Sequence, residues 1–354
     1  MATFVFRADA NVQIGGGHVL RSLVLAKRLA SRGHICIFIS VEESFNFVPV
    51  STAGVNVVEI KKSEFNNVEM IKHIYDRQAA NAIVVDSYQL DFEFETTLSS
   101  FFPKVIVFDD MPSRRHNADV LIDPTLGRKS SEYERFVDEN CLLLLGPEYA
   151  PMREEFSLLR DLSIGLKLQD SPRNLLISYG LTDPENLTLR TLKTLKTFLP
   201  EHKLTLDIVI GNGTPTRSEI IECAKTLKDG IKIHTNVEKM AELMLHSDII
   251  IGSPGSSSWE RCCMGIPSIL TSVAQNQIQI GEKLQEYGCA IYLGRFQEAN
   301  HQNLLGALES LLMSDSIRTN MIHSAAKVCT GLGSVRISER LEDLTSEGND
   351  KDFK

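Results

Sequence analysis

The chain has 354 residues, of which 43% are hydrophobic and 23% are charged, a composition typical of globular proteins and a length that suggests two domains. The net charge of -9 argues against a nucleic-acid-binding protein, because such proteins usually carry a basic patch. An anionic ligand would therefore have to be held by local groups, such as backbone amides and helix ends.

The N-terminal segment and the cysteines indicate a protein of the cytoplasm. The first ten residues include Arg7 and Asp9 and no long apolar run, so we expect no signal peptide. No apolar stretch reaches the ~18 residues that suggest a membrane span. The seven cysteines are scattered, without a Cys-x-x-Cys pair, and are interpreted as buried free thiols. We expect a monomer with neither membrane nor nucleic-acid partners.

In the first half of the chain, short apolar runs alternate with amphipathic helical stretches. The predicted strands are Thr3–Arg7, Ile35–Ser40, Val55–Ile60, Ala82–Asp86, Val105–Asp109, Val120–Asp123 and Leu142–Leu145. Most are continuously apolar, as in a parallel sheet that helices cover on both faces. Several end in a polar residue and a loop, and the carboxyl ends of such strands are where open α/β sheets bind ligands.

The same pattern restarts in the second half. The stretch Pro151–Asp170, helical at first and then charged and irregular, is interpreted as a linker. Strands are then predicted at Asn174–Ser178, Thr205–Gly211, Lys232–His234, Asp248–Gly252, Pro267–Leu270 and Ala290–Leu293. We therefore predict an α/β protein with two Rossmann-like domains in tandem and a ligand-binding cleft between them. The domains are placed at 1–160 and 171–333, and a last helix, about Ser334–Thr345, with a charged tail at 334–354.

The first candidate site is a run of three glycines, Gly15, Gly16 and Gly17, followed by His18 at the start of a helix. Glycines allow close backbone approach to a ligand, and a helix N-terminus favours phosphate. The dipole at that position favours a neutral imidazole, which can act as a general base. The alternative is that His18 only caps or packs the helix. The spacing does not match a dinucleotide-binding or P-loop motif.

The second candidate site follows the first strand of the second half. Gly180 permits a tight turn there, and Asp183 or Thr182 can cap the next helix with Pro184 at its first position. The functional interpretation is a loop whose amides reach a diphosphate. The alternative is an ordinary strand-to-helix turn.

The third candidate site is the small-residue loop 252–258, which precedes a helix with Glu260 near its first turn. Ser256 and Ser257 would add hydroxyl groups to an anion cradle. The carboxylate of Glu260 could accept two hydrogen bonds from a ribose diol, or could simply favour the helix dipole. A fourth loop carries three amide side chains in sequence, Gln275, Asn276 and Gln277.

No metal site is expected. The nine histidines form no His-x-x-x-His pair. Asp109 and Asp110 are adjacent carboxylates at a strand end, but neighbouring residues of a strand point in opposite directions. Asp109–Asp110 is instead interpreted as a solvated loop acid or a helix cap.

These sites in this order resemble one family, the UDP-sugar hydrolases of pseudaminic acid biosynthesis, which act on UDP-2,4-diacetamido-2,4,6-trideoxy-β-L-altropyranose. The resemblance extends from Phe6 to about Gly294. The motifs that carry it are Arg7-Ala8-Asp9, Ile14-Gly15-Gly16-Gly17-His18 with Arg21, Asp86-Ser87-Tyr88, Asp109-Asp110-Met111, Leu145-Gly146-Pro147-Glu148-Tyr149-Ala150, Pro254-Gly255-Ser256-Ser257-Ser258-Trp259-Glu260-Arg261-Cys262-Cys263 and Asn276-Gln277.

The resemblance implies a GT-B-like fold in which the second domain holds most of UDP. It implies that His18 activates the attacking water, that Glu260 binds the ribose, and that uracil lies near Val237 and Met240. The diphosphate would contact Gly180, Ser256 and Ser257, with Gly16 and Gly17 on the facing helix. Tyr88, Asn276 and Gln277 would contact the sugar. Single displacement then predicts inversion at the anomeric carbon, with no cofactor and no metal required.

The chain departs from the family pattern at two positions. Gly180-Leu181-Thr182-Asp183 stands where Gly-Gly-Ser-Asp is expected, and Leu181 lacks glycine's freedom at positive φ, which weighs against close approach to phosphate there. Gln275 replaces an acid, which weakens a role for charge and bears on sugar preference. Two other functions remain open, a GT-B glycosyltransferase with a UDP-sugar donor and a non-catalytic nucleotide-sugar binding protein.

Overall fold

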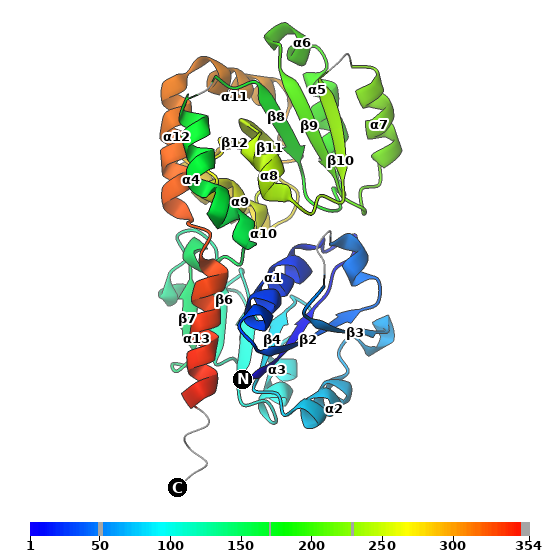
Figure 1. Ribbon diagram of the computed structural model, residues 1–354, viewed down its shortest axis with the longest axis vertical. Coiled ribbons are helices and arrows are strands. Elements are labelled where there is room, and N and C mark those ends of the chain that lie inside the picture. Colours follow the sequence, from blue (N-terminus) through cyan, green and yellow to red (C-terminus); the bar gives the residue numbers. More distant parts are fainter. Residues whose placement is uncertain (49–51, 170, 228–229, 348–354) are drawn as a thin grey trace.

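In the computed structural model, the chain forms two α/β domains stacked along the long axis of the molecule (Figure 1). The structure describes residues 1–48, 52–169, 171–227 and 230–347. The predicted charged tail beyond position 347 and the last residue of the predicted linker, Asp170, lie outside these ranges.

The first domain contains a seven-stranded parallel sheet in the order β3-β2-β1-β4-β5-β6-β7. Its strands are β1 (Thr3–Ala8), β2 (Ile35–Val41), β3 (Asn56–Ile60), β4 (Ala82–Asp86), β5 (Val105–Phe108), β6 (Val120–Asp123) and β7 (Leu142–Leu145). Its helices are α1 (Gly17–Ser31), α2 (Val68–Gln78) and α3 (Phe92–Ser99), with 3-10 turns η1 (Ser44–Phe47), η2 (Lys62–Glu64), η3 (Ser130–Glu132) and η4 (Pro147–Tyr149).

The second domain repeats the design with a six-stranded parallel sheet in the order β10-β9-β8-β11-β12-β13. Its strands are β8 (Asn174–Ser178), β9 (Thr205–Ile210), β10 (Ile231–Thr235), β11 (Ile249–Gly252), β12 (Ser268–Ser272) and β13 (Ile291–Arg295). Its helices are α4 (Glu154–Gln169), α5 (Leu187–Leu195), α6 (Phe198–His202), α7 (Arg217–Lys225), α8 (Met240–Leu245), α9 (Ser257–Cys263), α10 (Asn276–Glu286), α11 (His301–Met313) and α12 (Asp315–Val328).

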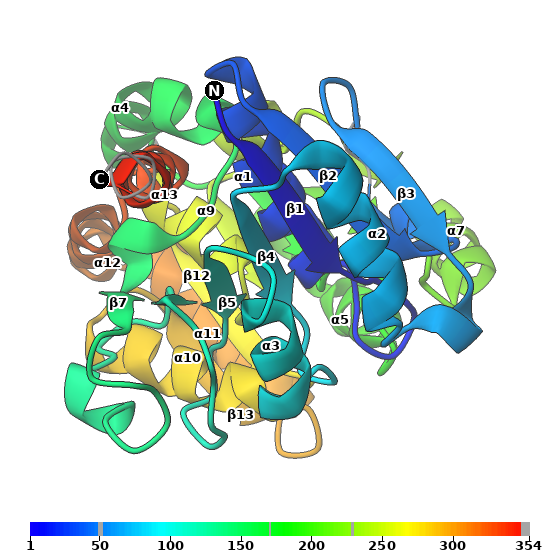
Figure 2. The same ribbon diagram turned by 90° about the horizontal axis from the view of Figure 1, so that it is seen from below.

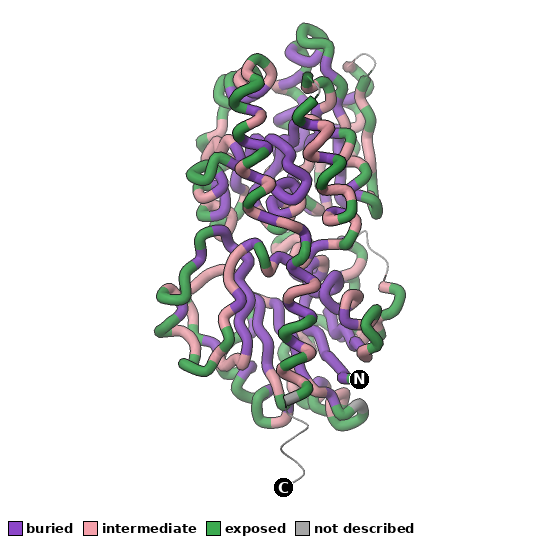
Figure 3. Tube along the Cα trace, turned by 60° about the vertical axis from the view of Figure 1, so that its left-hand side comes forward, coloured by how far each residue is buried: buried purple, intermediate pink, exposed green. Residues whose placement is uncertain are grey.

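Each sheet is covered on both faces, which explains the continuously apolar strands. In β1, Phe4 and Phe6 belong to one buried cluster and Val5 to another on the opposite face. Viewed from below, α2 and α3 lie on one side of the first sheet, and α1 and α13 (Gly333–Glu347) lie on the other (Figure 2). Buried positions therefore concentrate on the strands, and exposed positions on the outer helices and loops (Figure 3).

Every strand predicted from the sequence lies within two residues of an observed strand at each end. Two local predictions about helices were wrong, namely the position of Pro184 after β8 and the irregular end of the predicted linker. Pro184 does not begin a helix, because α5 starts at Leu187 after Asn186. Asp183 nevertheless caps that helix, since its carboxylate accepts hydrogen bonds from the backbone N–H groups of Leu187 (2.8 Å) and Thr188 (2.9 Å).

The predicted linker is also different, because α4 continues as a regular helix through Gln169. Two of its polar residues are buried rather than exposed to solvent. Ser163 and Lys167 are buried, and they donate hydrogen bonds to the carbonyl oxygens of Met264 (2.8 Å) and Leu245 (2.6 Å) at the ends of two other helices. The division at 1–160, 171–333 and 334–354 stays a prediction.

The chain passes between the domains twice, at neighbouring places. The first crossing leads through Met152 into α4, and the second leads from α12 into α13, which packs Ile337 and Leu341 into the first-domain core. The crossings are joined by Ser334, whose hydroxyl accepts from the Met152 N–H (3.0 Å) and donates to its carbonyl oxygen (2.9 Å). Within the described ranges, no helix is long and apolar enough to cross a membrane.

At the crossing between the domains, position 333 can hold only glycine without a backbone shift. A Cβ on Gly333 would lie 2.0 Å from the carbonyl oxygen of Ala150, so Gly333→Ala forces a backbone shift. We expect it to lower the free energy of unfolding by about 1–3 kcal/mol, measured by chemical denaturation. The matched control is Gly306→Ala on the exposed face of α11, where a Cβ meets no atom within 4 Å. Alanine there should raise stability by up to about 1 kcal/mol, and equal effects at both positions would contradict the argument.

Candidate active site

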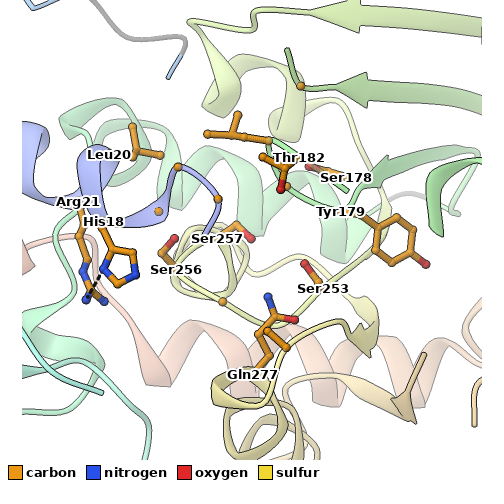
Figure 4. Close-up of a pocket in the computed structure, with 18 of the residues that line it drawn as sticks. His18, Leu20, Arg21, Ser178, Tyr179, Thr182, Ser253, Ser256, Ser257 and Gln277 are labelled. Carbon is orange, nitrogen blue, oxygen red and sulfur yellow. Dashed lines mark hydrogen bonds between the residues drawn. The ribbon is translucent and has the colours of Figure 1, made fainter. Parts of the chain in front are cut away.

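A pocket of about 310 Å³ lies between the carboxyl ends of the two sheets and is lined by both domains. It brings together every residue that the sequence analysis placed in the site. These are Gly16, Gly17, His18, Tyr88, Gly180, Val237, Met240, Ser256, Ser257, Glu260, Asn276 and Gln277. The close-up shows His18 and Arg21 of the first domain facing Ser256 and Ser257 of the second (Figure 4). The role of each residue stays a prediction.

His18 lies at the start of α1, and its orientation is fixed by a buried carboxylate. Its Nδ1 lies 2.6 Å from Oδ1 of Asp86, the last residue of β4. Because Asp86 is ionised, Nδ1 carries the proton and donates it, which leaves Nε2 as the acceptor. Arg21 also approaches Nδ1, but at 3.4 Å, and a protonated nitrogen cannot accept that bond. Nε2 makes no hydrogen bond with any described residue, so it is available to a molecule in the pocket.

Asp86 is itself held by several donors. It accepts hydrogen bonds from Nε (2.6 Å) and one terminal nitrogen (2.7 Å) of Arg21 and from the hydroxyl of Ser22 (3.0 Å), in addition to His18. Burial alone would raise the pKa of Asp86, but the positive charge and hydrogen bonds of Arg21, with His18, hold that pKa well below its usual range. The carboxylate is therefore charged at any pH at which the protein would be assayed.

A second polar chain crosses the pocket from one domain to the other. Asp110 accepts hydrogen bonds from Arg21 (3.3 Å) and from the hydroxyl of Tyr88. The same hydroxyl accepts a hydrogen bond from the side-chain amide of Asn276 (3.1 Å), which belongs to α10 in the second domain. The Tyr88 ring also packs edge-on against His18, with ring centroids 4.7 Å apart. Tyr88 thus connects the candidate base to the opposite wall.

In the loop after β8, the left-handed backbone is at Gly180 (φ +93°), Asp183 (φ +39°) and Asn186 (φ +54°). Leu181 does not adopt a positive φ, so its substitution for glycine carries no backbone strain. Gln275 forms a hydrogen bond with Arg295 (3.1 Å) and lies outside the pocket lining. Neither departure from the family pattern removes a group from the pocket wall.

Glu260 lines the pocket from α9 and is the candidate ribose ligand. Its carboxylate lies 3.4 Å from the guanidinium of Arg153, which also donates to the carbonyl oxygen of Glu238 (2.6 Å). Burial raises the pKa of Glu260, and the charge of Arg153 opposes that rise. Because Arg153 lies in the crossing between the domains, the ribose side of the pocket is tied to that crossing.

No catalytic or ligand-binding role was assigned from the sequence to several polar residues that shape the pocket, although Thr182 and Asp110 were considered as helix caps. Among them are Arg21, Asp86, Asp110, Arg153 and Thr182. The first three were part of recognised motifs, and strand-end carboxylates are a signal that could have singled out Asp86. No signal was available for the contacts of Arg153 with Glu238 and Glu260, which lie 85 and 107 residues away in the chain, although its ion pair with Glu155 (3.3 Å) is local.

Asp109 and Asp110 diverge, as expected for adjacent residues at a strand end. Asp110 faces the pocket, whereas Asp109 is fully buried and bonds to Nε2 of His116 (3.1 Å). The interpretation of Asp109 as a solvated acid or cap was therefore wrong, because the buried His116 supplies its partner. Among the described residues, no group of three His, Cys, Asp or Glu side chains is arranged to hold a metal ion.

Two facing Rossmann-like domains with a pocket at their strand ends define the GT-B class of fold, as predicted. MurG from Acinetobacter baumannii matches with a TM-score of 0.66 at 14% identity, over 97% of this chain and 100% of that one. S. aureus MnaA, solved with UDP, matches with a TM-score of 0.67 at 13% identity, over 97% and 96%. These likenesses establish the fold.

Sequence comparison adds the relatives, although no protein-family model matches the chain. It is 27% identical to the UDP-2,4-diacetamido-2,4,6-trideoxy-beta-L-altropyranose hydrolase of Campylobacter jejuni, over 71% of this chain and 85% of that protein. It is 23% identical to the spore coat polysaccharide biosynthesis protein SpsG of Bacillus subtilis, over 95% and 97%. An uncharacterized protein of Methanocaldococcus jannaschii is 28% identical over 77% of this chain, which spans about half (55%) of that relative. The resemblance that the motifs indicated is thereby confirmed.

The geometry around Asp86 predicts a large, pH-dependent effect of Asp86→Asn. The substitution removes the short ion pair of the buried Arg21 and leaves it only the longer one with Asp110 (3.3 Å), so we expect a loss of up to about 3–5 kcal/mol in the free energy of unfolding near pH 7. Because the folded pKa lies below the unfolded value of about 3.9, this contribution is fully present above that pH and is lost progressively as the pH falls from there towards the folded pKa.

Urea unfolding of both proteins between pH 8 and pH 3 measures this difference. The difference in the free energy of unfolding between the two proteins should be constant down to about pH 4 and should decrease below that pH. The control is Asp161→Asn at an exposed position of α4, which should change stability by less than about 0.5 kcal/mol. A difference that does not change with pH would show that Asp86 acts through packing rather than charge.

Proposed function

We propose that this protein hydrolyses a UDP-linked 2,4-diacetamido-2,4,6-trideoxyhexose of the altrose type to UDP and the free sugar, a step of pseudaminic acid biosynthesis. The observation that carries the proposal is the position of His18, with Nδ1 held by Asp86 and Nε2 open to the pocket. The name of the Campylobacter relative and the shared motifs support the choice of substrate. The proposal includes a monomeric, cytoplasmic protein.

In this scheme, Nε2 of His18 takes a proton from water as the water attacks the anomeric carbon. Asp86 keeps the imidazole in the required tautomer and stabilises the imidazolium that forms. The bond between the anomeric carbon and the diphosphate oxygen breaks in the same displacement, and its electron pair leaves with UDP. Attack from the face opposite UDP inverts the anomeric carbon.

The second domain would bind the nucleotide. Glu260 would accept hydrogen bonds from the ribose, and Val237 and Met240 would lie against uracil. The diphosphate would lie against Ser256 and Ser257. Spreading its charge over hydroxyl and amide donors makes UDP a better leaving group, and the scheme requires no metal.

The remaining predicted residues would complete the cradle and the sugar site. The turn at Gly180 would supply backbone donors to the diphosphate from the second domain. Gly16 and Gly17 would approach from the N-terminus of α1, which presents free N–H groups. Tyr88, Asn276 and Gln277 would contact the sugar, and the hydrogen bond between Tyr88 and Asn276 shows that they meet across the cleft.

The first functional prediction concerns His18. Incubation with the UDP-linked diacetamido-trideoxyaltrose should release UDP and the free sugar. NMR of the anomeric proton should show that the anomeric carbon of the sugar is initially inverted. His18→Ala should lower kcat by about 10²–10⁴-fold, because no other described group takes the proton at that position. The control is His301→Ala, an exposed histidine of α11 outside the pocket, which should leave the rate unchanged.

The outcomes separate this function from its competitors. UDP release without an added acceptor, lost in His18→Ala while UDP binding persists, supports hydrolysis. UDP binding without release, followed by release when an acceptor sugar or lipid is added, would identify a glycosyltransferase. Binding without turnover under any condition, and without an effect of His18→Ala, would identify a binding protein.

The second functional prediction concerns Glu260. Glu260→Gln should weaken UDP binding by about 10–100-fold, because a neutral amide accepts weaker hydrogen bonds from the ribose diol. Calorimetric titration with UDP and with 2′,3′-dideoxy-UDP tests this cause, since the dideoxy analogue lacks both hydroxyls and should bind the two proteins equally. Glu242→Gln, at an exposed pair with Lys239 on α8, is the control. An equal loss for both ligands would contradict a ribose contact.

A further inference from the structure

Arginines in the interior of this protein almost always lie against a carboxylate. Within the described ranges, five arginines are no more than 8% exposed. Four of them form ion pairs, which are Arg7 with Asp9, Arg21 with Asp86, Arg128 with Asp123 and Arg318 with Asp315. The fifth, Arg261, is 2% exposed and forms an ion pair with no described residue.

The contacts of Arg261 are all with neutral groups. Its guanidinium donates hydrogen bonds to the carbonyl oxygen of Ser253 (2.9 Å) and to the hydroxyls of Ser257 (3.0 Å) and Ser258 (2.9 Å). Burial lowers the pKa of Arg261 to about 10, so the group is still positively charged at neutral pH. The carboxylate of the neighbouring Glu260 attracts this charge but forms no ion pair with it. A buried charge without a direct counter-charge costs several kcal/mol, which is a reason to look for an anion that arrives from outside.

The position of Arg261 indicates where that anion would bind. The strand order of the second sheet reverses direction between β8 and β11, and open α/β sheets bind ligands at such a point. Ser178 and Gly252, the last residues of these two strands, are paired in register. A Cβ on Gly252 would lie only 3.6 Å from a terminal nitrogen of Arg261. The guanidinium therefore lies directly beneath the crevice.

Two of the three serines that bind Arg261 also form the wall of the pocket. Ser253 and Ser257 line the pocket, whereas Arg261 does not, so its guanidinium lies behind these two residues, to which it is hydrogen-bonded. The Ser257 hydroxyl accepts a hydrogen bond from Arg261, which leaves its own proton to be donated in another direction. Figure 4 shows Ser253, Ser256 and Ser257 around the same side of the pocket.

We propose that Arg261 is the counter-charge for the substrate's diphosphate and acts on it through Ser257, as a positioning residue rather than one that touches the ligand. This inference rests on the proposed function, because it takes a nucleoside diphosphate as the anion. The diphosphate gains negative charge as the bond to the sugar breaks, so the interaction is stronger in the transition state than in the bound substrate. Arg261 therefore contributes to kcat as well as to binding.

Calorimetric titration with uridine, UMP and UDP tests the proposal. In the unaltered protein, affinity should rise with each phosphate. Arg261→Gln should lower the affinity for UDP by about 10–100-fold and leave that for uridine unchanged, since only the phosphates interact with the charge. The UDP affinity of Arg261→Lys, which keeps the charge, should lie between that of the unaltered protein and that of Arg261→Gln. Ser257→Ala should lower the affinity for UDP and leave the affinity for uridine unchanged. This variant provides a second test if Arg261→Gln does not fold.

The matched control is Arg160→Gln. Arg160 also supports α9, through a hydrogen bond to the carbonyl oxygen of Cys263 (2.9 Å), but it does not contact the serine loop. The Arg160→Gln variant should show the same increase in affinity from uridine to UDP as the unaltered protein. Equal losses of uridine and UDP affinity in Arg261→Gln would overturn the proposal in favour of a purely structural role, as would an unchanged UDP affinity. If the unaltered protein itself gains nothing from uridine to UDP, the proposed function fails instead.

Discussion

The carboxylate of Asp86 is the interaction on which the first-domain half of the site depends. It ends β4 at the sheet edge that faces the pocket, and it binds His18, Arg21 and Ser22, which all belong to the first turns of α1. Because Asp86 is fully buried, it must be satisfied by these donors, and they in turn fix the rotation of α1 over the sheet. The orientation of the candidate base is therefore a consequence of folding rather than of ligand binding.

The two domains meet the pocket with different chemistry. The first contributes charged groups that are already paired, whereas the second contributes mainly small residues, hydroxyls and amides, with Glu260 as its charged group. Apart from the ion pair of Arg153 with Glu260 at the crossing, the direct polar contacts between the domains include neutral ones, such as Asn276 with Tyr88 (3.1 Å) and Asn212 with the carbonyl oxygen of Asn46 (2.9 Å). Each domain has its own apolar core, so these contacts are minor beside the packing within domains, and movement of one domain against the other is the default expectation for such an interface.

The fold and the place of the site could be predicted from sequence because both follow from local patterns. Apolar runs mark buried parallel strands, and small residues after those strands mark the loops of the pocket. What could not be predicted are the partners, because β4 lies beside β1 only through a crossover and Asp86 is 68 residues from His18. The interpretation of residues 151–170 as partly irregular failed for the same reason. The acceptors of Ser163 and Lys167 lie at the ends of helices distant in the sequence. From the sequence alone, these two polar residues were therefore taken for solvent-exposed ones.

The acidic net charge and the anionic ligand proposed for this pocket are compatible because the relevant positive charge is internal. A surface patch of lysines would attract many anions and would be weakened by salt, since exposed charges are screened over about 8–10 Å at physiological ionic strength. Arg261 is almost completely shielded from solvent by the serine loop, so its field is felt mainly by a group that enters the crevice and displaces water. The other deeply buried arginines of the described chain have their charge neutralised by a carboxylate, which confines this field to one place. A protein with a net charge of -9 can thus hold a diphosphate without presenting a general anion-binding surface.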